Sequence, residues 1–194
     1  MLKFNRAAAN QSVSAPDTPA VTIPAAAKAL CFMTRFDGLV SGDNPQNLFS
    51  TGGISAARSL NAVYFTTGAS NAAQQGRVSL YANGQTSLAS ALTTATPISS
   101  GVHIFAYVWT IDPDLLSVYR CEITGTTRTA ADVVLEGTTT ASHFFGEMDS
   151  FGLTYGSHLD NVANRKCDQS LGRGSMSLGT LTLDDIAQLA NGME

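Results

Sequence analysis

The sequence predicts an all-β protein in which two antiparallel sheets pack face to face, followed by one short helix. From Leu30 onward, short apolar runs are separated by Gly, Pro, Asn and Asp, which is the pattern of strands and turns. Helical periodicity is almost absent before Thr182. The chain has 194 residues, of which 44% are hydrophobic, so we expect one domain with one core.

The N-terminal segment, residues 1–28, is predicted to form an extended or flexible arm, and residues 29–194 form the domain. The arm is rich in Ala, Ser, Thr and Asn, and Pro16, Pro19 and Pro24 favour extended backbone. A segment of this composition buries too little apolar area to order itself. We therefore expect either a loose terminus or an arm that lies along a neighbouring surface.

Within the domain, alternation and turn residues predict a series of short strands. They cover residues 30–36, 48–49, 62–66, 77–82, 102–111, 116–123, 133–135, 151–155 and 175–181. In the strand 77–82, Val78 and Leu80 alternate with Ser79 and Tyr81. The dipeptide at 83–84, Asn-Gly, then fits a type I′ hairpin turn because both central positions need a positive φ.

The chain is expected to end in a helix that begins after Thr182. The Thr182 side chain can accept a hydrogen bond from an amide of the first turn, and Asp184 and Asp185 suit the positive end of the helix dipole. Gly192 can end the helix. We expect this helix to pack on the sheet edge through one apolar stripe: Leu183, Ile186, Ala187, Leu189 and Ala190.

The charge pattern excludes several classes of partner. Only 13% of the residues are charged and the net charge is −4, so the basic surface that nucleic-acid binding needs is missing. No apolar run approaches the ~20 residues of a membrane span, and the N-terminus lacks the apolar core of a secretion signal. We expect synthesis in the cytoplasm, with no membrane association.

One long stretch, residues 38–111, is unusually poor in charge. Its only charged residues are Asp43, Arg58 and Arg77. Either much of this stretch is covered by other chains, or Ser and Thr side chains keep it in solution.

Metal and cofactor sites are not expected. The spacing of the histidines fits no metal motif, and we expect partly exposed strand or loop residues: His103, His143 and His158. The cysteines are expected to be small buried residues: Cys31, Cys121 and Cys167. The acidic positions 43–44 and 112–114 lack the spacing of a calcium loop, so we interpret them as turns.

An enzymatic role is not expected either. Glu147 and Asp149 would share one face of a strand and could present paired carboxylates. A retaining glycosidase needs a further carboxylate a few positions on, but the chain has Phe151 and Gly152 there. The acid/base partner of a nucleophile is therefore missing.

The strand 102–111 supplies the candidate binding site. One face carries small apolar residues, and the other carries Phe105, Tyr107 and Trp109. If the aromatic face points outward, these three side chains form a ladder on which sugars could stack. Alternatively, the aromatic residues fill the core, because periodicity alone cannot choose between two apolar faces.

Three stretches resemble the concanavalin A-like lectin/glucanase (laminin-G-like) family. Residues 100–108 and 116–119 are similar to the family's turn, strand and partner strand, and residues 181–189 are similar to its closing strand and helix. The resemblance implies a jelly-roll fold and a binding role over residues 30–192. The family's tryptophan is Val102 here, and residues 174–179 are glycine-rich where the family has an acidic run.

Composition, arm and resemblance together give two expected functions. The first is a non-enzymatic structural protein of a phage virion, in the capsid or the tail, whose arm docks onto other virion proteins or onto copies of itself. The alternative is a carbohydrate-binding module that recognises a cell-surface glycan through Phe105, Tyr107 and Trp109.

Overall fold

The structure is a computed structural model of the 194-residue chain. It describes residues 2–3, 13–14, 29–36, 45–50, 60–65, 69, 71–82, 92–111, 114–140, 154–155, 170–177 and 179–192. Within these residues, no helix is long and apolar enough to span a membrane. The predicted turn at 83–84 lies outside them.

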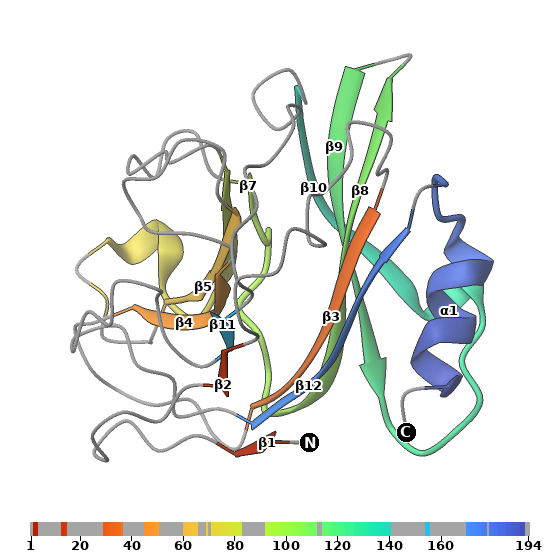
Figure 1. Cartoon of the computed structure of the whole chain (residues 1–194), viewed down its shortest axis with the longest axis horizontal. Coiled ribbons are helices and arrows are strands. Elements are labelled where there is room, and N and C mark those ends of the chain that lie inside the picture. The colour runs from red at the N-terminus through yellow and green to blue at the C-terminus, as the bar shows by residue number, and fades with distance from the viewer. Residues whose placement is uncertain are drawn as a thin grey trace.

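The strands form two antiparallel six-stranded sheets that face each other (Figure 1). Sheet A contains, in spatial order, β1 (Leu2–Lys3), β12 (Ser170–Ser177), β3 (Ala29–Phe36), β8 (Gly101–Ile111), β9 (Asp114–Ile123) and β10 (Val133–Thr140). Sheet B contains β2 (Val13–Ser14), β11 (Thr154–Tyr155), β4 (Gln46–Ser50), β5 (Leu60–Tyr64), β6 (Val78–Ala82) and β7 (Leu92–Thr93). Two 3-10 turns, η1 (Ala72–Gln74) and η3 (Ala130–Asp132), and the helix α1 (Leu183–Gly192) complete the described elements.

This architecture confirms the predicted fold class, an all-β sandwich with a short C-terminal helix. Two short parts of the predicted arm belong to the chain's own sheets, because β1 pairs with β12 and β2 pairs with β11. Each of these strands is the first in the order of its sheet, so it lies at an edge. The prediction that the arm docks onto other subunits stays a prediction.

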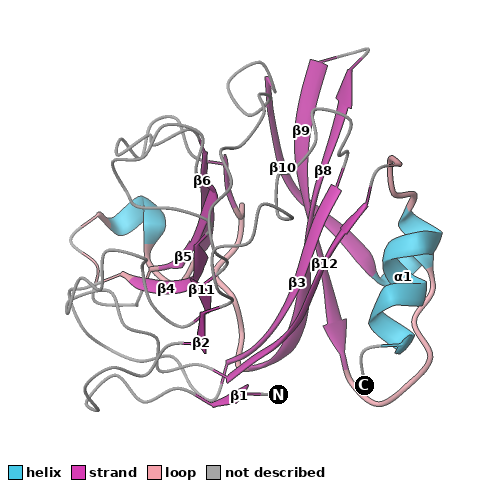
Figure 2. Ribbon diagram, in the orientation of Figure 1, coloured by secondary structure: helices cyan, strands magenta, loops and turns pink. Residues whose placement is uncertain are grey.

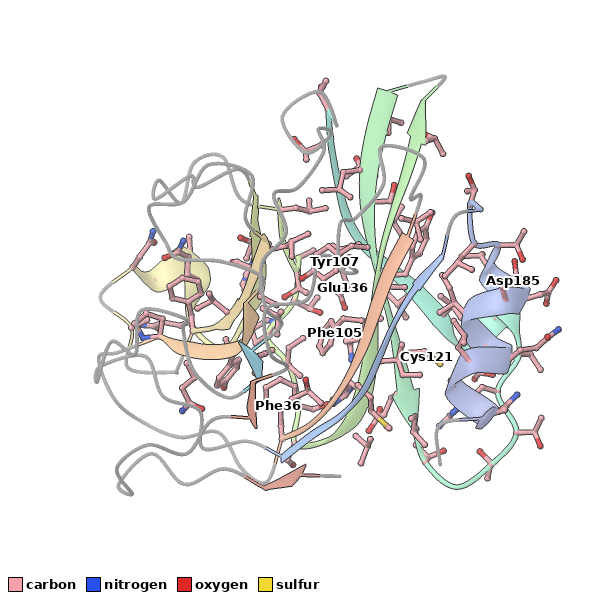
Figure 3. The ribbon with its side chains drawn as sticks, in the orientation of Figure 1. Phe36, Phe105, Tyr107, Cys121, Glu136 and Asp185 are labelled. Carbon is pink, nitrogen blue, oxygen red and sulfur yellow. The ribbon has the colours of Figure 1, made fainter. Side chains whose placement is uncertain are left out.

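Sheet A is apolar on both of its faces. One face, with Ile104, Ala106 and Val108 of β8, packs with Cys121 of β9 and with α1. The other face, with Phe105 and Tyr107, looks toward sheet B (Figure 3). Cys121 is fully buried, as the sequence analysis predicted for this residue.

The helix lies on the outer face of sheet A, on the side away from sheet B (Figure 2). The prediction that it packs on the sheet edge is wrong, because the small residues of β8 leave an apolar face broad enough to seat it. Its predicted start is confirmed: the Asp185 amide donates to Thr182 Oγ1 at 3.2 Å, and the Thr182 amide donates to Asp185 Oδ2 at 2.8 Å. The Thr182 amide and the Thr182 hydroxyl both donate to Asp185 Oδ2, and these bonds hold the pKa of the Asp185 carboxyl below its usual range.

Sheet B has one apolar face and one polar face. The register places six residues of its six strands in one cross-strand row that faces sheet A: Val13, Tyr155, Phe49, Ala62, Leu80 and Leu92. Ala62, Leu80 and Leu92 are buried there. Tyr64, two positions along β5 from Ala62, contacts Phe36 of sheet A with ring centroids 4.9 Å apart. This alternation is typical of an antiparallel sheet with a single packed face.

A buried residue of β10, Glu136, contacts the connection where β7 of sheet B leads into β8 of sheet A. Glu136 of β10 accepts a hydrogen bond from Arg120 Nε at 2.6 Å and another from the Thr96 amide at 3.0 Å. The Glu136 carbonyl also accepts from the Ala95 amide at 2.9 Å. Because Thr96 follows β7 of sheet B, the Glu136 carboxylate holds the connection between the sheets against β10.

Replacement of Ile186 by alanine should weaken the contact between α1 and sheet A. Ile186 is 0% exposed, and truncation of such a side chain leaves a cavity that costs about 3 kcal/mol. Urea unfolding of Ile186→Ala should show this loss, whereas Gln188→Ala, exposed on the same helix, should change stability by less than about 0.5 kcal/mol. Equal effects of the two substitutions would contradict this placement of the helix.

Replacement of Glu136 by glutamine should weaken the contact between β10 and the connection from β7 to β8. The Glu136 side chain is 1% exposed, and its loss as a charge leaves Arg120 without its ion-pair partner. Breaking a buried pair in this way costs about 3 kcal/mol. Urea unfolding measures the loss, and Thr138→Ala, at an exposed position of the same strand, is the control. A stability equal to that of the control would show that the pair contributes little.

Candidate functional site

The structure buries the aromatic face of β8 between the sheets. Phe105 and Tyr107 are both 0% exposed, and Phe105 contacts Phe36 with ring centroids 6.3 Å apart. The outward aromatic ladder is therefore wrong for these two residues, because the large side chains fill the interior and the small ones of the opposite face lie under α1. Trp109 pairs with Leu116 on β9, but its side chain lies outside the described part. Its role as a ligand contact stays a prediction.

His103 is also fully buried, which corrects the prediction of a partly exposed residue. Its Nε2 lies 3.0 Å from the Ser99 carbonyl, so this nitrogen carries the proton of the neutral ring. Its Nδ1 has no hydrogen-bond partner among the described residues. A Cβ on Gly101 would lie 3.1 Å from Glu122 Oε1 and 3.5 Å from His103 Nε2, so glycine leaves room for both side chains.

The surroundings of His103 favour the neutral form of the ring. Burial is the largest effect and lowers the pKa of His103, the Ser99 carbonyl raises it, and Arg120 lowers it further. Glu122 and Glu136 act in the opposite direction but do not outweigh burial. A buried neutral imidazole without access to solvent cannot act as a general base for an external substrate.

Tyr64 and Thr34 are two further polar residues of this interior. Burial raises the pKa of Tyr64 to about 12. Neither the Tyr64 hydroxyl nor Thr34 Oγ1 has a hydrogen-bond partner among the described residues. Thr34 pairs with His103 across β3 and β8, so two of these polar residues lie side by side in the core.

The other chemical candidates from the sequence lie outside the described residues. These are His143, His158, Cys167, the pair Glu147 and Asp149, and the turn positions 43–44 and 112–113. Among the residues that are described, no group of three or more His, Cys, Asp or Glu side chains could hold a metal ion.

Of the two outer faces of the sandwich, that of sheet A is occupied. Ile186, Ala187 and Ala190 of α1 are at most 2% exposed and pack on β8 and β9. The outer face of sheet B is the other face of the sandwich.

The outer face of sheet B carries a row of polar positions. Ser14 pairs with Thr154, Thr154 with Ser50, Ser50 with Asn61, and Asn61 with Tyr81. Alternation along β5 places Asn61 on the face opposite Ala62, which is in the interior. We call these five residues the polar row; it crosses β2, β11, β4, β5 and β6.

A second row lies beside the polar row on the same face. Asn47 pairs with Val63, Val63 with Ser79, and Ser79 with Thr93. The hydroxyls of Ser79 and Thr93 are 2.6 Å apart. Val63 and Ser79 are covered, and Val63 packs with Phe65 and Ala69. Val63 and Ser79 of this second row are therefore covered and offer no further site.

The polar row combines hydroxyl, amide and aromatic residue types. Ser, Thr and Tyr hydroxyls donate and accept hydrogen bonds, and an Asn amide does both at once. Neighbouring strands are about 4.8 Å apart, so five positions span roughly 19 Å. A row of this length suits an extended polar ligand better than a single small molecule.

Sequence reasoning missed the polar row. The alternation of Leu80 and Ala82 with Ser79 and Tyr81 was a local signal that one face of this strand is polar. No local signal could join Ser14, Thr154 and Asn61, because the strands that carry them are far apart in the chain.

Three solved structures show the same fold at low sequence identity. The carbohydrate-binding module CBM40 of the Ruminococcus gnavus IT-sialidase, bound to α2,3-sialyllactose, has a TM-score of 0.54 at 12% identity, over 84% of this chain and 82% of that one. A heptameric SAP-like pentraxin from Limulus polyphemus has a TM-score of 0.56 at 13% identity, over 92% and 81%. The binding domain of botulinum neurotoxin DC, in complex with SialylT, has a TM-score of 0.52 at 9% identity, over 87% of this chain but 36% of that one.

No protein-family model matches the sequence, and no curated protein matches it significantly. The structural similarity shows that the chain has the jelly-roll fold of lectin-like domains, as the resemblance in its sequence implied.

The stability of the protein should fall as the pH drops below 6.5, the ordinary pKa of histidine. The folded state lowers the pKa of His103, so between the folded and unfolded pKa values the unfolded chain binds more protons, and acid favours unfolding. One proton gives a slope of at most about 1.4 kcal/mol per pH unit. Urea unfolding at several pH values measures it, and His103→Gln should flatten the profile.

The depressed pKa values of Asp132 and Asp185 lie below 3.8, so these carboxyls do not titrate in the same window. An unchanged slope in His103→Gln would show that another group is responsible.

Proposed function

We propose that this protein is a non-catalytic carbohydrate-binding module, and that it binds an oligosaccharide along the polar row of sheet B. The observation that carries the proposal is the register of sheet B, which gathers Ser14, Thr154, Ser50, Asn61 and Tyr81 on one outer face. On the outer face of sheet A, by contrast, α1 packs against Ile104, Ala106 and Cys121 of β8 and β9.

The chemistry of the row suits a sugar. A sugar presents hydroxyls that need both donors and acceptors, and Ser, Thr and Asn supply both. The polar positions alternate with the buried apolar row, so the backbone that holds them is fixed by the core of the sandwich. The tyrosine type at position 81 adds a ring on which a sugar face can stack.

The comparisons support this function in a general way. Two of the similar structures were determined with sialylated sugars, and the CBM40 module belongs to a sialidase. Their identity to this chain is too low to transfer a ligand or a residue role, so the proposal rests on the polar row. Positions 151 and 152, shortly after Glu147 and Asp149, carry Phe and Gly instead of a further carboxylate, which supports a binding rather than a hydrolytic role.

The alternative expectation, a structural component of a phage virion, stays a prediction. The pairing of β1 and β2 within the chain's own sheets neither requires nor excludes contacts of residues 1–28 with other proteins.

Glycan binding by the purified full chain tests the proposal. A glycan array should identify bound oligosaccharides, and titration calorimetry should show that Asn61→Ala weakens binding about tenfold, the value of one lost hydrogen bond with a partner left unsatisfied. Thr138→Ala, exposed on β10 of the other sheet, should bind as the wild type does. Melting temperatures of the variants establish that each is folded.

Two results would contradict the proposal. The first is a folded protein that binds no glycan on the array. The second is normal binding by Asn61→Ala and Tyr81→Ala together with lost binding by Trp109→Ala. That pattern would place the site at the end of β8, as the sequence alone suggested.

A further inference from the structure

We infer that the ligand of the polar row is an uncharged oligosaccharide rather than a sialylated one. This inference rests on the proposed function and specifies its substrate class. It departs from the sialylated ligands of the structurally similar domains, because it follows from the charge of this chain's own residues.

The polar row and the row beside it contain no charged residue. Their nine positions are Ser14, Thr154, Ser50, Asn61, Tyr81, Asn47, Val63, Ser79 and Thr93. A sialic acid brings a carboxylate, which accepts hydrogen bonds but cannot donate them. Partial burial of that carboxylate without a cation costs more than burial of neutral hydroxyls.

Cations are scarce throughout the part of the chain that builds β4 to β8. Residues 44–111 contain two, Arg58 and Arg77. Arg77 comes directly before β6, and its Nη1 donates to the Thr94 carbonyl at 3.3 Å. It lies two residues before Ser79, on the same face by alternation, and four residues before Tyr81, about 13 Å from the polar row at the rise of an antiparallel strand. Arg58 lies outside the described residues.

The overall charge acts in the same direction. The chain has a net charge of −4, so its long-range field repels an anionic glycan and leaves a neutral one unaffected. The charge-poor stretch 38–111 thus gains a functional explanation beside solubility: it leaves β4, β5, β6 and β7 of sheet B without charged residues, where a neutral sugar is to be bound by hydrogen bonds and stacking.

Binding to matched neutral and sialylated glycans tests the inference. The purified full chain is applied to an array that carries each neutral oligosaccharide beside its α2,3- and α2,6-sialylated forms, and affinities of the bound pairs are measured by calorimetry. We expect the neutral member to bind at least about tenfold more tightly. Its affinity should change less than about twofold between about 20 mM and about 500 mM NaCl, because no ion pair is screened. Asn61→Ala should weaken this binding, and Thr138→Ala should not.

The outcomes separate the inference from the function on which it rests. Tighter binding of the sialylated member, with an affinity that falls with salt or is lost in Arg77→Ala, would overturn the inference and leave carbohydrate binding intact. Equal affinity for both members would also overturn it. Binding of no glycan of either kind would overturn the proposed function, and the inference with it.

Discussion

The central strand β8 is apolar on both faces, so sheet A has to be covered from both sides. Sheet B covers the face that carries Phe105 and Tyr107, and α1 covers the face that carries Ile104, Ala106 and Val108. Without either cover, a broad apolar surface would meet water, at a cost of about 25 cal/mol for each Å² exposed. The order of the layers, sheet B, sheet A and helix, follows from this requirement.

Sheet B differs, because most of its apolar residues lie in the interior, and Val63 on its outer face is covered by Phe65 and Ala69. Alternation of apolar and polar residues gives it one face that packs and one that can meet polar molecules. The bonds of Glu136 hold the connection from β7 to β8 against β10 and so fix the two sheets relative to each other. The polar row therefore lies over a core that is held in place by contacts with sheet A.

The polar face of sheet B is built almost without charged side chains. Ser, Thr and Asn occupy the positions where many domains carry Lys and Glu, which leaves hydrogen bonding as the main interaction that sheet B can offer. The His103 ring lies between the sheets, and burial keeps it uncharged there. Acid is therefore expected to act on the fold through the core rather than through the proposed binding face.

The sequence by itself determined the fold class, the approximate strands and the start of the helix, because these depend on alternation, turn residues and capping between near neighbours. Thr182 and Asp185 are an example, since their pairing is local. Only the tertiary structure decided which face of β8 is internal, where α1 packs and which residues form the polar row. Both faces of β8 are apolar, so periodicity could not distinguish them. Ser14, Thr154 and Asn61 meet only through the strand order of sheet B, which depends on long-range pairing that no local pattern encodes.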